Sequence, residues 1–310
     1  MKLSFVIPCY GSELTIENVI NEITGVMAQK PDYDYEIICV NDCSPDNVYS
    51  ILLSIASKNP RVTVVDLTKN MGKHAAVMAG YSLVSGDIIV NLDDDGQSPM
   101  PELWNLLEPL KNGYDISIAK YLKKKQSKFK NFGSSINAMM SRFLLGRPKG
   151  LAFDNFSVVK RFIIDEVLKY QNPYPYLEGL YLRSSNRITN VVMDERERVA
   201  GKGNYTFVKS TQLWLNGFTA FSVKPLRLAS VLGTIIATVG FIAGIWVIVR
   251  KLFIFPEMQL GYPSLIVTLL FIGGILMVML GLLGEYIGRI YISLNNSPQY
   301  VIREVIRNKD

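Results

Sequence analysis

Two long uncharged apolar runs near the C-terminus constrain the fold of this chain more than any other feature. Residues 228–249 are 22 consecutive residues without a charged side chain, and residues 262–284 are 23. At 1.5 Å of rise per helical residue, each run spans about 33 Å, enough to cross a hydrocarbon core of roughly 30 Å. We therefore predict two transmembrane helices. The alternative is a pair of buried core helices, which seldom run uncharged past about 18 residues.

The charges around these runs predict how they are oriented. Only residues 250–261 separate them, so we expect a hairpin over 226–288 with both flanks on one side of the membrane. The flanks carry Lys209, Lys224, Arg227, Arg289, Arg303, Arg307 and Lys309, against Arg250 and Lys251 in the connection. The positive-inside rule then places residues 1–225 and the tail 289–310 in the cytoplasm. Glycines in both runs give the hairpin a face to bury, which is compatible with a homo-oligomer.

Composition excludes several other classes of protein. The chain has 310 residues, of which 49% are hydrophobic, so disordered and collagen-like chains are excluded. Its net charge of +6 suits an anionic partner such as a phosphate, a nucleotide or a lipid headgroup, and nucleic acid is not expected. The odd number of cysteines (Cys9, Cys39 and Cys43) predicts reduced thiols. The first ten residues lack the pattern of a cleaved signal peptide.

Residues 1–225 read as alternating strands and helices. Short β-rich apolar runs cover 2–10, 36–42, 62–67 and 87–94, and helical patterns cover 13–28, 47–57, 73–84 and 100–111. This alternation predicts an α/β domain whose mostly parallel sheet is covered on both faces. Ligands of such sheets bind beyond the carboxyl ends of the strands, so we expect the functional residues within 8–13, 41–46 and 93–97.

Three consecutive acids follow the last of these strands. Asp93, Asp94 and Asp95 repel one another, and Gln97 adds an amide two residues later. A divalent cation relieves such repulsion, and hard oxygen ligands suit Mg²⁺ or Mn²⁺ bridging a diphosphate. The alternative is a solvated acidic turn.

A second strand ends in an acidic segment, VNDCSPD. Asp42 can accept a hydrogen bond from a base N–H or a ribose hydroxyl, and the alternative is a turn in which Ser44 or Asp46 caps the next helix. No G-x-G-x-x-G or P-loop string follows any strand, which counts against dinucleotide and ATP-hydrolysing sites. His74 is the single histidine, so a zinc site built on histidines or a Ser–His–Asp triad is not expected.

Four strings occur in an order that resembles a known family: VIPCYGSE, VNDCSPD, NMGKHAAVMAGYSLVSGDIIVNLDDDGQSP and SVKPLR. They are similar to family 2 glycosyltransferases, most closely to the branch that acts on polyprenyl phosphates. The resemblance implies a GT-A (Rossmann-like) domain with a C-terminal transmembrane hairpin, in an inner membrane protein of a bacterium. It also implies inverting, metal-dependent transfer of a sugar from a nucleotide donor, by preference UDP-linked, to an acceptor such as undecaprenyl phosphate, for modification of cell-envelope glycans.

The resemblance also implies roles for particular residues. It implies that Asp93, Asp95 and Gln97 bind the metal, Mg²⁺ or Mn²⁺. It implies that the nucleotide sugar is bound by Pro8, Tyr10, Glu13, Asn41, Asp42, Lys73, Asp93, Asp94 and Lys202. It further implies that Asp95, Asp154 and Arg198 are catalytic and that the acceptor lipid phosphate is bound by Lys120, Lys130 and Arg198.

Three segments depart from the family's pattern. Asn41 stands where relatives often have an acid. In the string GKGNY, Gly203 and Asn204 replace the usual Ser and Lys, so Lys202 is the charge that remains. Asp154, in the string FDNFS, lies one residue out of register with the usual G-D-F-R. The catalytic assignment of Asp154 rests on that shifted match.

Two segments are expected to lie on the membrane surface. A lysine-rich run over 120–130 leads into apolar residues at helical spacing, which predicts an interfacial helix at about 130–145. A second interfacial helix is predicted over 206–221, where Trp214 suits the depth of the headgroups. The alternative is a solvated loop and an ordinary helix that faces the core.

Two other functions stay open at this point. One is a membrane synthase that extends a polysaccharide, although Gln212, Leu213 and Trp214 do not match its Q-x-x-R-W string and two spans make a poor channel. The other is a non-catalytic, membrane-tethered subunit that binds a nucleotide sugar.

Overall fold

A computed structural model of the protein describes residues 1–121, 146–194, 196, 224–249, 253, 261–295 and 297–308. The chain divides into two compact units, one made of Met1–Gly217 and Asn296–Asp310 and the other of Phe218–Asn295. The predicted interfacial helices at 130–145 and 206–221 lie outside the described residues.

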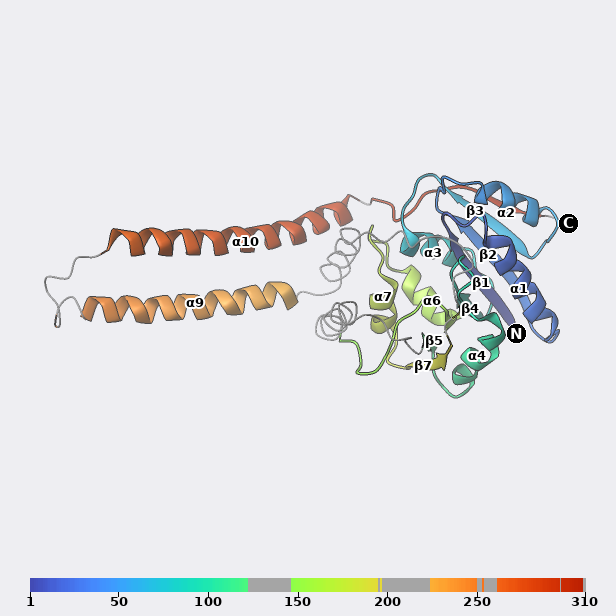
Figure 1. Cartoon of the computed structure of the whole chain (residues 1–310), viewed down its shortest axis with the longest axis horizontal. Helices are drawn as coiled ribbons and strands as arrows, with labels where there is room; N and C mark the ends of the chain where they lie inside the picture. Colours follow the sequence, from blue (N-terminus) through green and yellow to red (C-terminus); the bar gives the residue numbers. More distant parts are fainter. Residues whose placement is uncertain are drawn as a thin grey trace. The chain divides into compact units, whose positions relative to one another are not determined.

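The first unit is a doubly wound α/β fold around one sheet (Figure 1). Its first half alternates strand and helix: β1 (Lys2–Cys9), α1 (Ile16–Ala28), β2 (Asp34–Asn41), α2 (Val48–Ala56), β3 (Val62–Leu67), α3 (Lys73–Tyr81) and β4 (Ile88–Asn91). The sheet continues through η1 (Met100–Glu102), α4 (Leu103–Lys111), β5 (Ile116–Tyr121), β6 (Ser157–Lys160), α6 (Arg161–Leu168), α7 (Leu177–Ser184) and β7 (Ile188–Met193). The predicted mostly parallel sheet is confirmed.

The two faces of the sheet are covered by different helices. Alternate residues of β1, such as Phe5 and Ile7, face a core shared with α1, α2 and α4, because successive side chains of a strand point to opposite faces. Val6 points the other way, where α3 approaches so closely that Gly80 has no room for a side chain. The helices α1 and α4 contribute apolar residues at three- and four-residue spacing, which is the pattern of a helix with one buried face.

The order of the strands is β7-β5-β6-β4-β1-β2-β3-β8. The strands β1 to β5 and β7 run in one direction, while β6 and β8 are antiparallel to their neighbours. The chain winds from β1 outwards through β2 to β3 and then returns to place β4 on the other side of β1. The strand order therefore reverses between β1 and β4, where doubly wound sheets form a crevice at their carboxyl ends.

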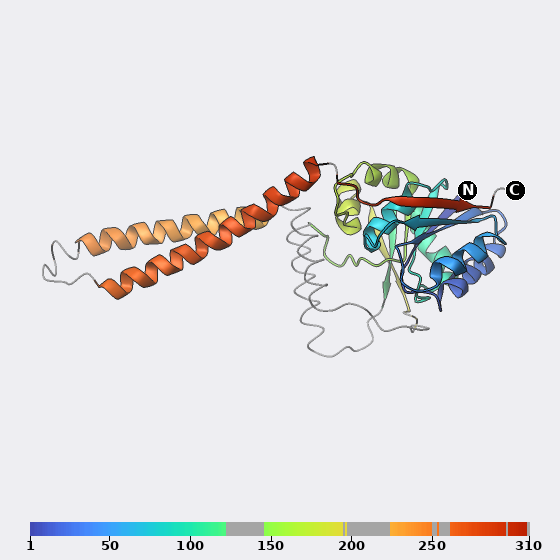
Figure 2. The same ribbon diagram turned by 90° about the horizontal axis from the view of Figure 1, so that it is seen from above.

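The predicted tail, 289–310, supplies a strand of this sheet. β8 (Ile302–Arg307) pairs with the outer edge of β3, and Figure 2 shows it, in red, alongside the strands of the N-terminal half. Gln299, just before it, donates to the carbonyl oxygens of Tyr170 and Asn172 at 2.6 and 2.8 Å. The tail is thus built into the first unit rather than separate from it, because β3 would otherwise leave an unpaired edge.

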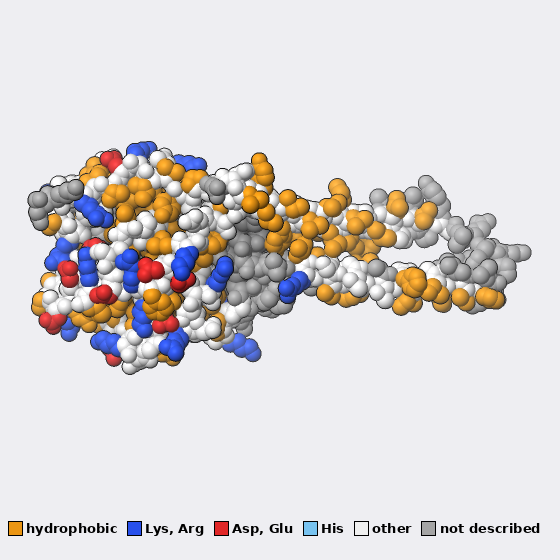
Figure 3. All heavy atoms as spheres, turned by 180° about the vertical axis from the view of Figure 1, so that it is seen from behind, with side chains coloured by type: hydrophobic (Ala, Val, Ile, Leu, Met, Phe, Trp, Pro, Cys, Tyr) orange, Lys and Arg blue, Asp and Glu red, His pale blue; other side chains and the backbone are white. Residues whose placement is uncertain are grey.

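The second unit consists of two long helices, α9 (Lys224–Val249) and α10 (Tyr262–Leu294). Both are long and apolar enough to cross a membrane, by length and composition. Hydrophobic side chains lie on their surfaces (Figure 3), and residues such as Phe241 and Leu269 are more than 60% exposed. The helices are consistent with the predicted hairpin, although α10 continues ten residues beyond the predicted span, from 284 to Leu294.

Candidate functional site

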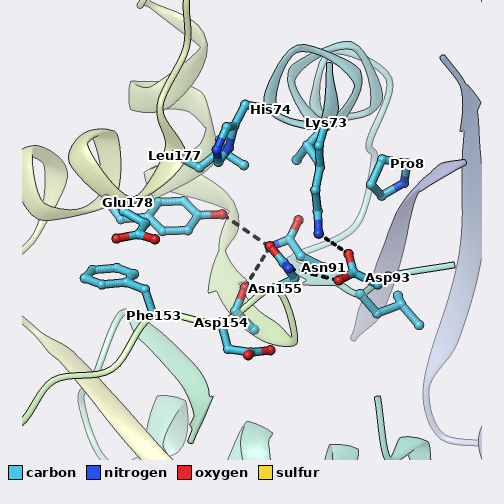
Figure 4. A pocket seen from close by; sticks show the side chains of 14 residues that line it. Pro8, Lys73, His74, Asn91, Asp93, Phe153, Asp154, Asn155, Leu177 and Glu178 are labelled. Atoms are coloured by element: carbon cyan, nitrogen blue, oxygen red, sulfur yellow. Dashed lines mark hydrogen bonds and ion pairs between the residues drawn. The ribbon is translucent and has the colours of Figure 1, made fainter. Parts of the chain in front are cut away.

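A pocket of about 160 Å³ opens at the reversal of strand order (Figure 4). β1 and β4 contribute its floor, α3 and α7 contribute two walls, and the segment before β6 contributes a third. The lining residues are Pro8, Lys73, His74, Val77, Asn91, Leu92, Asp93, Phe153, Asp154, Asn155, Ser157, Leu177, Glu178 and Tyr181. Of the predicted site residues, Pro8, Lys73, Asp93 and Asp154 line this pocket.

Lys73 and Asp93 form the charged side of the pocket. Lys73 is the first residue of α3, and its ammonium pairs with the carboxylate of Asp93, which follows β4 (Figure 4). Asn155 donates to the other oxygen of Asp93 at 2.9 Å. Asp93 is therefore held from two sides, with its carboxylate and the Lys73 ammonium both half-buried at the pocket wall.

The next two acids have other partners. The carboxylate of Asp94 accepts the backbone N–H of Tyr10 at 2.9 Å, and its carbonyl oxygen accepts the Thr15 hydroxyl at 2.6 Å, so Asp94 ties β4 to the loop after β1. Burial raises the pKa of Asp94 to about 6. Asp95 accepts the N–H of Gln97 at 3.1 Å, and the Gln97 amide donates to the carbonyl oxygen of Arg196 at 3.2 Å.

Asp42 connects the end of β2 with the loop that precedes α3. Its two oxygens accept the backbone N–H groups of Met71 and Gly72 at 2.7 and 2.9 Å. The side chain is 3% exposed, and this burial raises its pKa. Its neighbour Asn41 donates to Asp66 at 2.7 Å and accepts the N–H of Ser44 at 3.2 Å. In this structure the side chains of Asn41 and Asp42 hold the loops together.

The loops after β1 and β2 are joined by reciprocal hydrogen bonds. Asp46 accepts the N–H of Glu13 at 2.9 Å, while Glu13 accepts the N–H of Asn47 at 2.9 Å. Ser44 accepts the N–H of Gly11 at 2.8 Å and donates to Asp46 at 2.6 Å. Asp46 also accepts the N–H of Val48 at 3.3 Å at the start of α2, which is the helix-capping alternative considered for this segment. Tyr10 is 47% exposed at the rim of these loops.

Two further carboxylates lie across the pocket from Lys73. Asp154 and Glu178 come from the segment before β6 and from α7, and Figure 4 shows both beside Phe153. Desolvation by the surrounding protein raises the pKa of Asp154 to about 6, with a smaller contribution from the charge of Asp93, although its side chain is open to the pocket. Burial also raises the pKa of Glu178.

Neutral polar groups complete the pocket. Burial lowers the pKa of His74 to about 4, so its ring is neutral at physiological pH and packs edge-on against Tyr176 at 5.5 Å. In the lining of the pocket, Asn91 accepts the Tyr81 hydroxyl at 2.7 Å and donates to Ser157 and Tyr181 at 3.1 and 3.2 Å.

Several predicted residues are not at the pocket. Lys120, at the end of β5, donates to the carbonyl oxygen of Gly150 at 3.1 Å. Lys130, Arg198 and Lys202 lie outside the described residues, so their predicted roles stay predictions. Conversely, sequence reasoning did not select Glu178, Asn155 or Tyr181 as site residues. Asn155 has a signal in the string FDNFS, whereas Glu178 sits in an ordinary amphipathic helix.

The donor set after β4 fits a hard divalent cation. Asp93, Asp95 and Gln97 supply oxygen ligands within one turn. Among the residues that the structure describes, no three side chains of His, Cys, Asp or Glu are grouped to hold a metal. In proteins, Mg²⁺ is usually bound by one or two carboxylates together with substrate phosphates.

Comparisons with known proteins agree with this architecture. The sequence model of glycosyl transferase family 2 matches residues 4–169, and that of the GtrB C-terminal hairpin matches residues 224–290. A prophage-derived bactoprenol glucosyl transferase of Shigella flexneri is 32% identical over 98% of both chains. An undecaprenyl-phosphate 4-deoxy-4-formamido-L-arabinose transferase of Serratia proteamaculans is 32% identical over 98% of this chain and 94% of its own.

A solved structure supports the fold. Glucosyl-3-phosphoglycerate synthase from Mycobacterium tuberculosis, in complex with Mn²⁺, UDP and phosphoglyceric acid, has a TM-score of 0.52 at 20% identity, covering 69% of this chain and 75% of that one. The GT-A fold and the glycosyltransferase activity implied by the resemblance are confirmed. The chain belongs to glycosyl transferase family 2.

Proposed function

We propose that this protein transfers a sugar from a nucleoside diphosphate sugar to a polyprenyl phosphate in a bacterial membrane. The observation that carries the proposal is the pocket at the reversal of strand order, where Lys73 and Asp93 face Asp154 and Glu178. Relatives named for bactoprenol and undecaprenyl phosphate, which the chain matches over almost its full length, support the choice of acceptor.

The donor's nucleotide lies against the loops after β1 and β2, and its diphosphate lies near Lys73. Asp42 is placed beside the backbone of Met71 and Gly72, and Tyr10 is exposed at the same rim. Lys73 supplies a positive charge at the N-terminus of α3, where the helix dipole also favours an anion. A UDP-linked donor is our preference because the resemblance points to it.

Asp93, Asp95 and Gln97 would hold Mg²⁺ or Mn²⁺ together with the donor, and such a cation would supply neutralisation of charge on the departing diphosphate. The ammonium of Lys73, which pairs with Asp93 in the structure, stays close enough to share in this neutralisation. Arg198 and Lys202 add positive charge to the diphosphate or to the acceptor phosphate.

The pocket, with a volume of about 160 Å³, has the polarity of a sugar site. Asp154, Glu178 and Asn155 present hydrogen-bonding groups towards its interior, and Phe153 and Leu177 present apolar surface. Hydrogen-bonding side chains of this kind bind the hydroxyl groups of a sugar and orient its anomeric carbon.

The acceptor is already an anion at neutral pH, so the reaction needs no strong base. One oxygen of the polyprenyl phosphate attacks the anomeric carbon, the bond to the nucleoside diphosphate breaks, and the configuration inverts. Asp154 contributes by orienting the sugar and by its negative charge, which stabilises the positive charge that develops on the ring. The hairpin formed by α9 and α10, with Lys120 and Lys130 of the basic run, brings the enzyme to its lipid acceptor.

The test uses the full chain purified in detergent. Release of nucleoside diphosphate is measured with Mg²⁺ or Mn²⁺ and a panel of nucleotide sugars, with and without undecaprenyl phosphate. We expect release that requires both the lipid phosphate and one particular donor. Release with a sugar polymer in place of the lipid would support a polysaccharide synthase instead.

Asp95→Ala distinguishes catalysis from a binding subunit. Removing a ligand of the metal should lower turnover by about a hundredfold or more while the thermal unfolding midpoint stays unchanged. Asp32→Ala, at an exposed position before β2, is the matched control and should behave as wild type. Equal activity of wild type and Asp95→Ala would contradict the proposed mechanism.

A further inference from the structure

One arginine of β8, Arg303, connects this strand to the proposed nucleotide site by hydrogen bonds. Arg303 lies on β8, which follows the two apolar helices in the sequence and completes the sheet beside β3. We propose that Arg303 is a positioning residue for the donor's nucleotide, acting through the loops that end β2 and precede α3. This inference rests on the proposed nucleotide-sugar site.

A β-bulge directs the Arg303 side chain. Asp66 pairs with Glu304 and Leu67 with Ile302, so Arg303 is the extra residue between the two pairs. A bulge bends the strand locally and changes the direction of a side chain, and bulges are common beside functional sites. Here the guanidinium reaches across the edge of the sheet and donates to the Asp66 carboxylate at 2.8 Å.

Asp66 links Arg303 to the end of β2, because it accepts hydrogen bonds from both. Its carboxyl group is 2% exposed and accepts from Arg303 on one oxygen and from the Asn41 amide, at 2.7 Å, on the other. The Asn41 side chain in turn accepts the N–H of Ser44 at 3.2 Å. Arg303 therefore fixes the rotamer of Asn41 and, through it, the turn that contains Asp42.

The same arginine acts on the loop before α3. A second guanidinium nitrogen lies 3.4 Å from the carbonyl oxygen of Thr68, and the Thr68 N–H donates to the Val301 carbonyl at 3.0 Å. Three residues later, Met71 and Gly72 donate their N–H groups to Asp42. β8 thus supports both of the segments that meet at Asp42.

Charge compensation explains why an arginine is needed. A buried carboxylate is costly unless it is paired and hydrogen-bonded. Without Arg303, the buried Asp66 carboxylate keeps only the Asn41 amide, and its uncompensated charge favours a side chain that turns towards water. This change disturbs Asn41, so the turn that holds Asp42 loses its fixed position before the donor binds.

The experiment compares Arg303→Met with wild type in the full-length protein. Calorimetric titration with UDP, GDP and CDP in the presence of Mn²⁺ identifies the nucleotide that wild type binds. For that nucleotide we expect the dissociation constant to rise roughly five- to tenfold in Arg303→Met. In the transfer reaction the donor KM should rise similarly, while kcat stays within about twofold.

Hydrogen exchange supplies a readout without substrate. The amide protons of Met71 and Gly72 should exchange faster in Arg303→Met, because their acceptor Asp42 is less well positioned. Arg307→Met is the matched control, with the same substitution at an exposed position of the same strand. It should leave nucleotide binding and the exchange of both amides unchanged.

Two rescue variants separate positioning from general damage. Arg303→Lys should recover part of the affinity, since a lysine restores one charge but not the second contact. Asp66→Asn combined with Arg303→Met removes the uncompensated charge and should bind the nucleotide more tightly than Arg303→Met alone.

The outcomes are distinct. Wild-type affinity and wild-type exchange in Arg303→Met, with wild type binding a nucleoside diphosphate, would overturn the role of Arg303 and leave the proposed function standing. Binding of none of the three nucleotides by wild type would overturn the proposed function, and this inference with it.

Discussion

Three consecutive acids in one turn have three different environments. Asp93 faces Lys73 in the pocket, Asp94 accepts the N–H of Tyr10, and Asp95 accepts the N–H of Gln97. The sequence shows the cluster and its place after a buried strand, and the mutual repulsion of three adjacent carboxylates predicts that the cluster has a function. It cannot assign each side chain its direction, which depends on the loop after β1, 84 residues away from Asp94 in the sequence.

Substituting the acids by asparagine should separate their roles. In Asp94→Asn the amide oxygen still accepts the Tyr10 N–H, so turnover should stay within about tenfold of wild type. Asp93→Asn removes a charge from the proposed metal and diphosphate site and should lower turnover by about a hundredfold or more. Initial rates of nucleoside diphosphate release measure both. An equal loss in the two variants would mean that Asp94 also acts on the donor.

Near the amino-terminal end of β2, on the side of the sheet away from the pocket's strand ends, Glu36 is a structural carboxylate. It accepts hydrogen bonds from Ser4 at 2.6 Å and from the backbone and hydroxyl of Ser85 at 2.6 and 2.8 Å, and Lys2 lies at 3.0 Å. Burial alone would raise its pKa, but these hydrogen bonds together outweigh burial and lower the pKa. The ionised form therefore stabilises the folded protein.

This shift predicts how stability depends on pH. Because the pKa in the folded protein is below that of the unfolded chain, the stabilisation is complete above the unfolded value of about 4.3 and is lost as the pH falls through the folded value. Glu36→Gln should cost about 2 kcal/mol of unfolding free energy at pH 7 and much less near pH 3. Thermal unfolding midpoints across this range measure the effect.

A surface acid provides the control for this measurement. Glu108 pairs with Lys111 at 3.5 Å, with both side chains about 60% exposed, so Glu108→Gln should change the unfolding free energy by less than about 0.5 kcal/mol. A pH-independent cost of Glu36→Gln would contradict the assignment.

At the scale of helices and strands, the close approach of α3 to the sheet can be tested at one glycine. A Cβ on Gly80 would collide with the Val6 side chain and lie 3.2 Å from Val40. Gly80→Ala should therefore push α3 away and cost about 2 kcal/mol of unfolding free energy. Since α3 begins at Lys73, the donor KM should rise as well.

Gly25 in α1 is the matched control. A Cβ there meets nothing within 4 Å, so Gly25→Ala should stabilise the protein by about 0.5 kcal/mol through the lower entropy of the unfolded chain. The thermal unfolding midpoint should be highest for Gly25→Ala, intermediate for wild type and lowest for Gly80→Ala. A neutral Gly80→Ala would mean that α3 and the sheet tolerate a wider separation.

The elements that sequence patterns predict are those with a local signal. β1 to β4 and their helices each show an apolar run or a helical spacing, and their predicted bounds differ from the structure by a few residues. β8 has no such signal, because its six residues, IREVIR, form neither a continuous apolar run nor a regular alternation, and they pair with β3 more than 230 residues earlier. For the same reason, no sequence pattern predicts the role that we propose for Arg303 at the nucleotide site.

At the scale of the whole molecule, the two apolar helices interrupt a single fold. The described chain contributes residues 1–121 and 146–194 to the first unit, leaves it for α9 and α10, and returns to complete the sheet with β8. Both ends of the pair of helices therefore connect to the same unit. We predict that both ends lie on one side of the membrane and, from the positive-inside rule, that this side is cytoplasmic.

The protein carries its own reporter for this orientation. Of its three cysteines, Cys9 and Cys39 are buried and Cys43 is exposed, so a membrane-impermeant maleimide should react only with Cys43 in the folded protein. We expect labelling in inverted bacterial membrane vesicles and none in right-side-out vesicles or spheroplasts. Cys43→Ser, which removes the exposed thiol, should abolish the signal. Met258→Cys in that background places a thiol in the connection between the helices and should give the opposite pattern. Labelling of Cys43 from the outside would contradict the cytoplasmic placement and the supply of a cytoplasmic nucleotide sugar to the site.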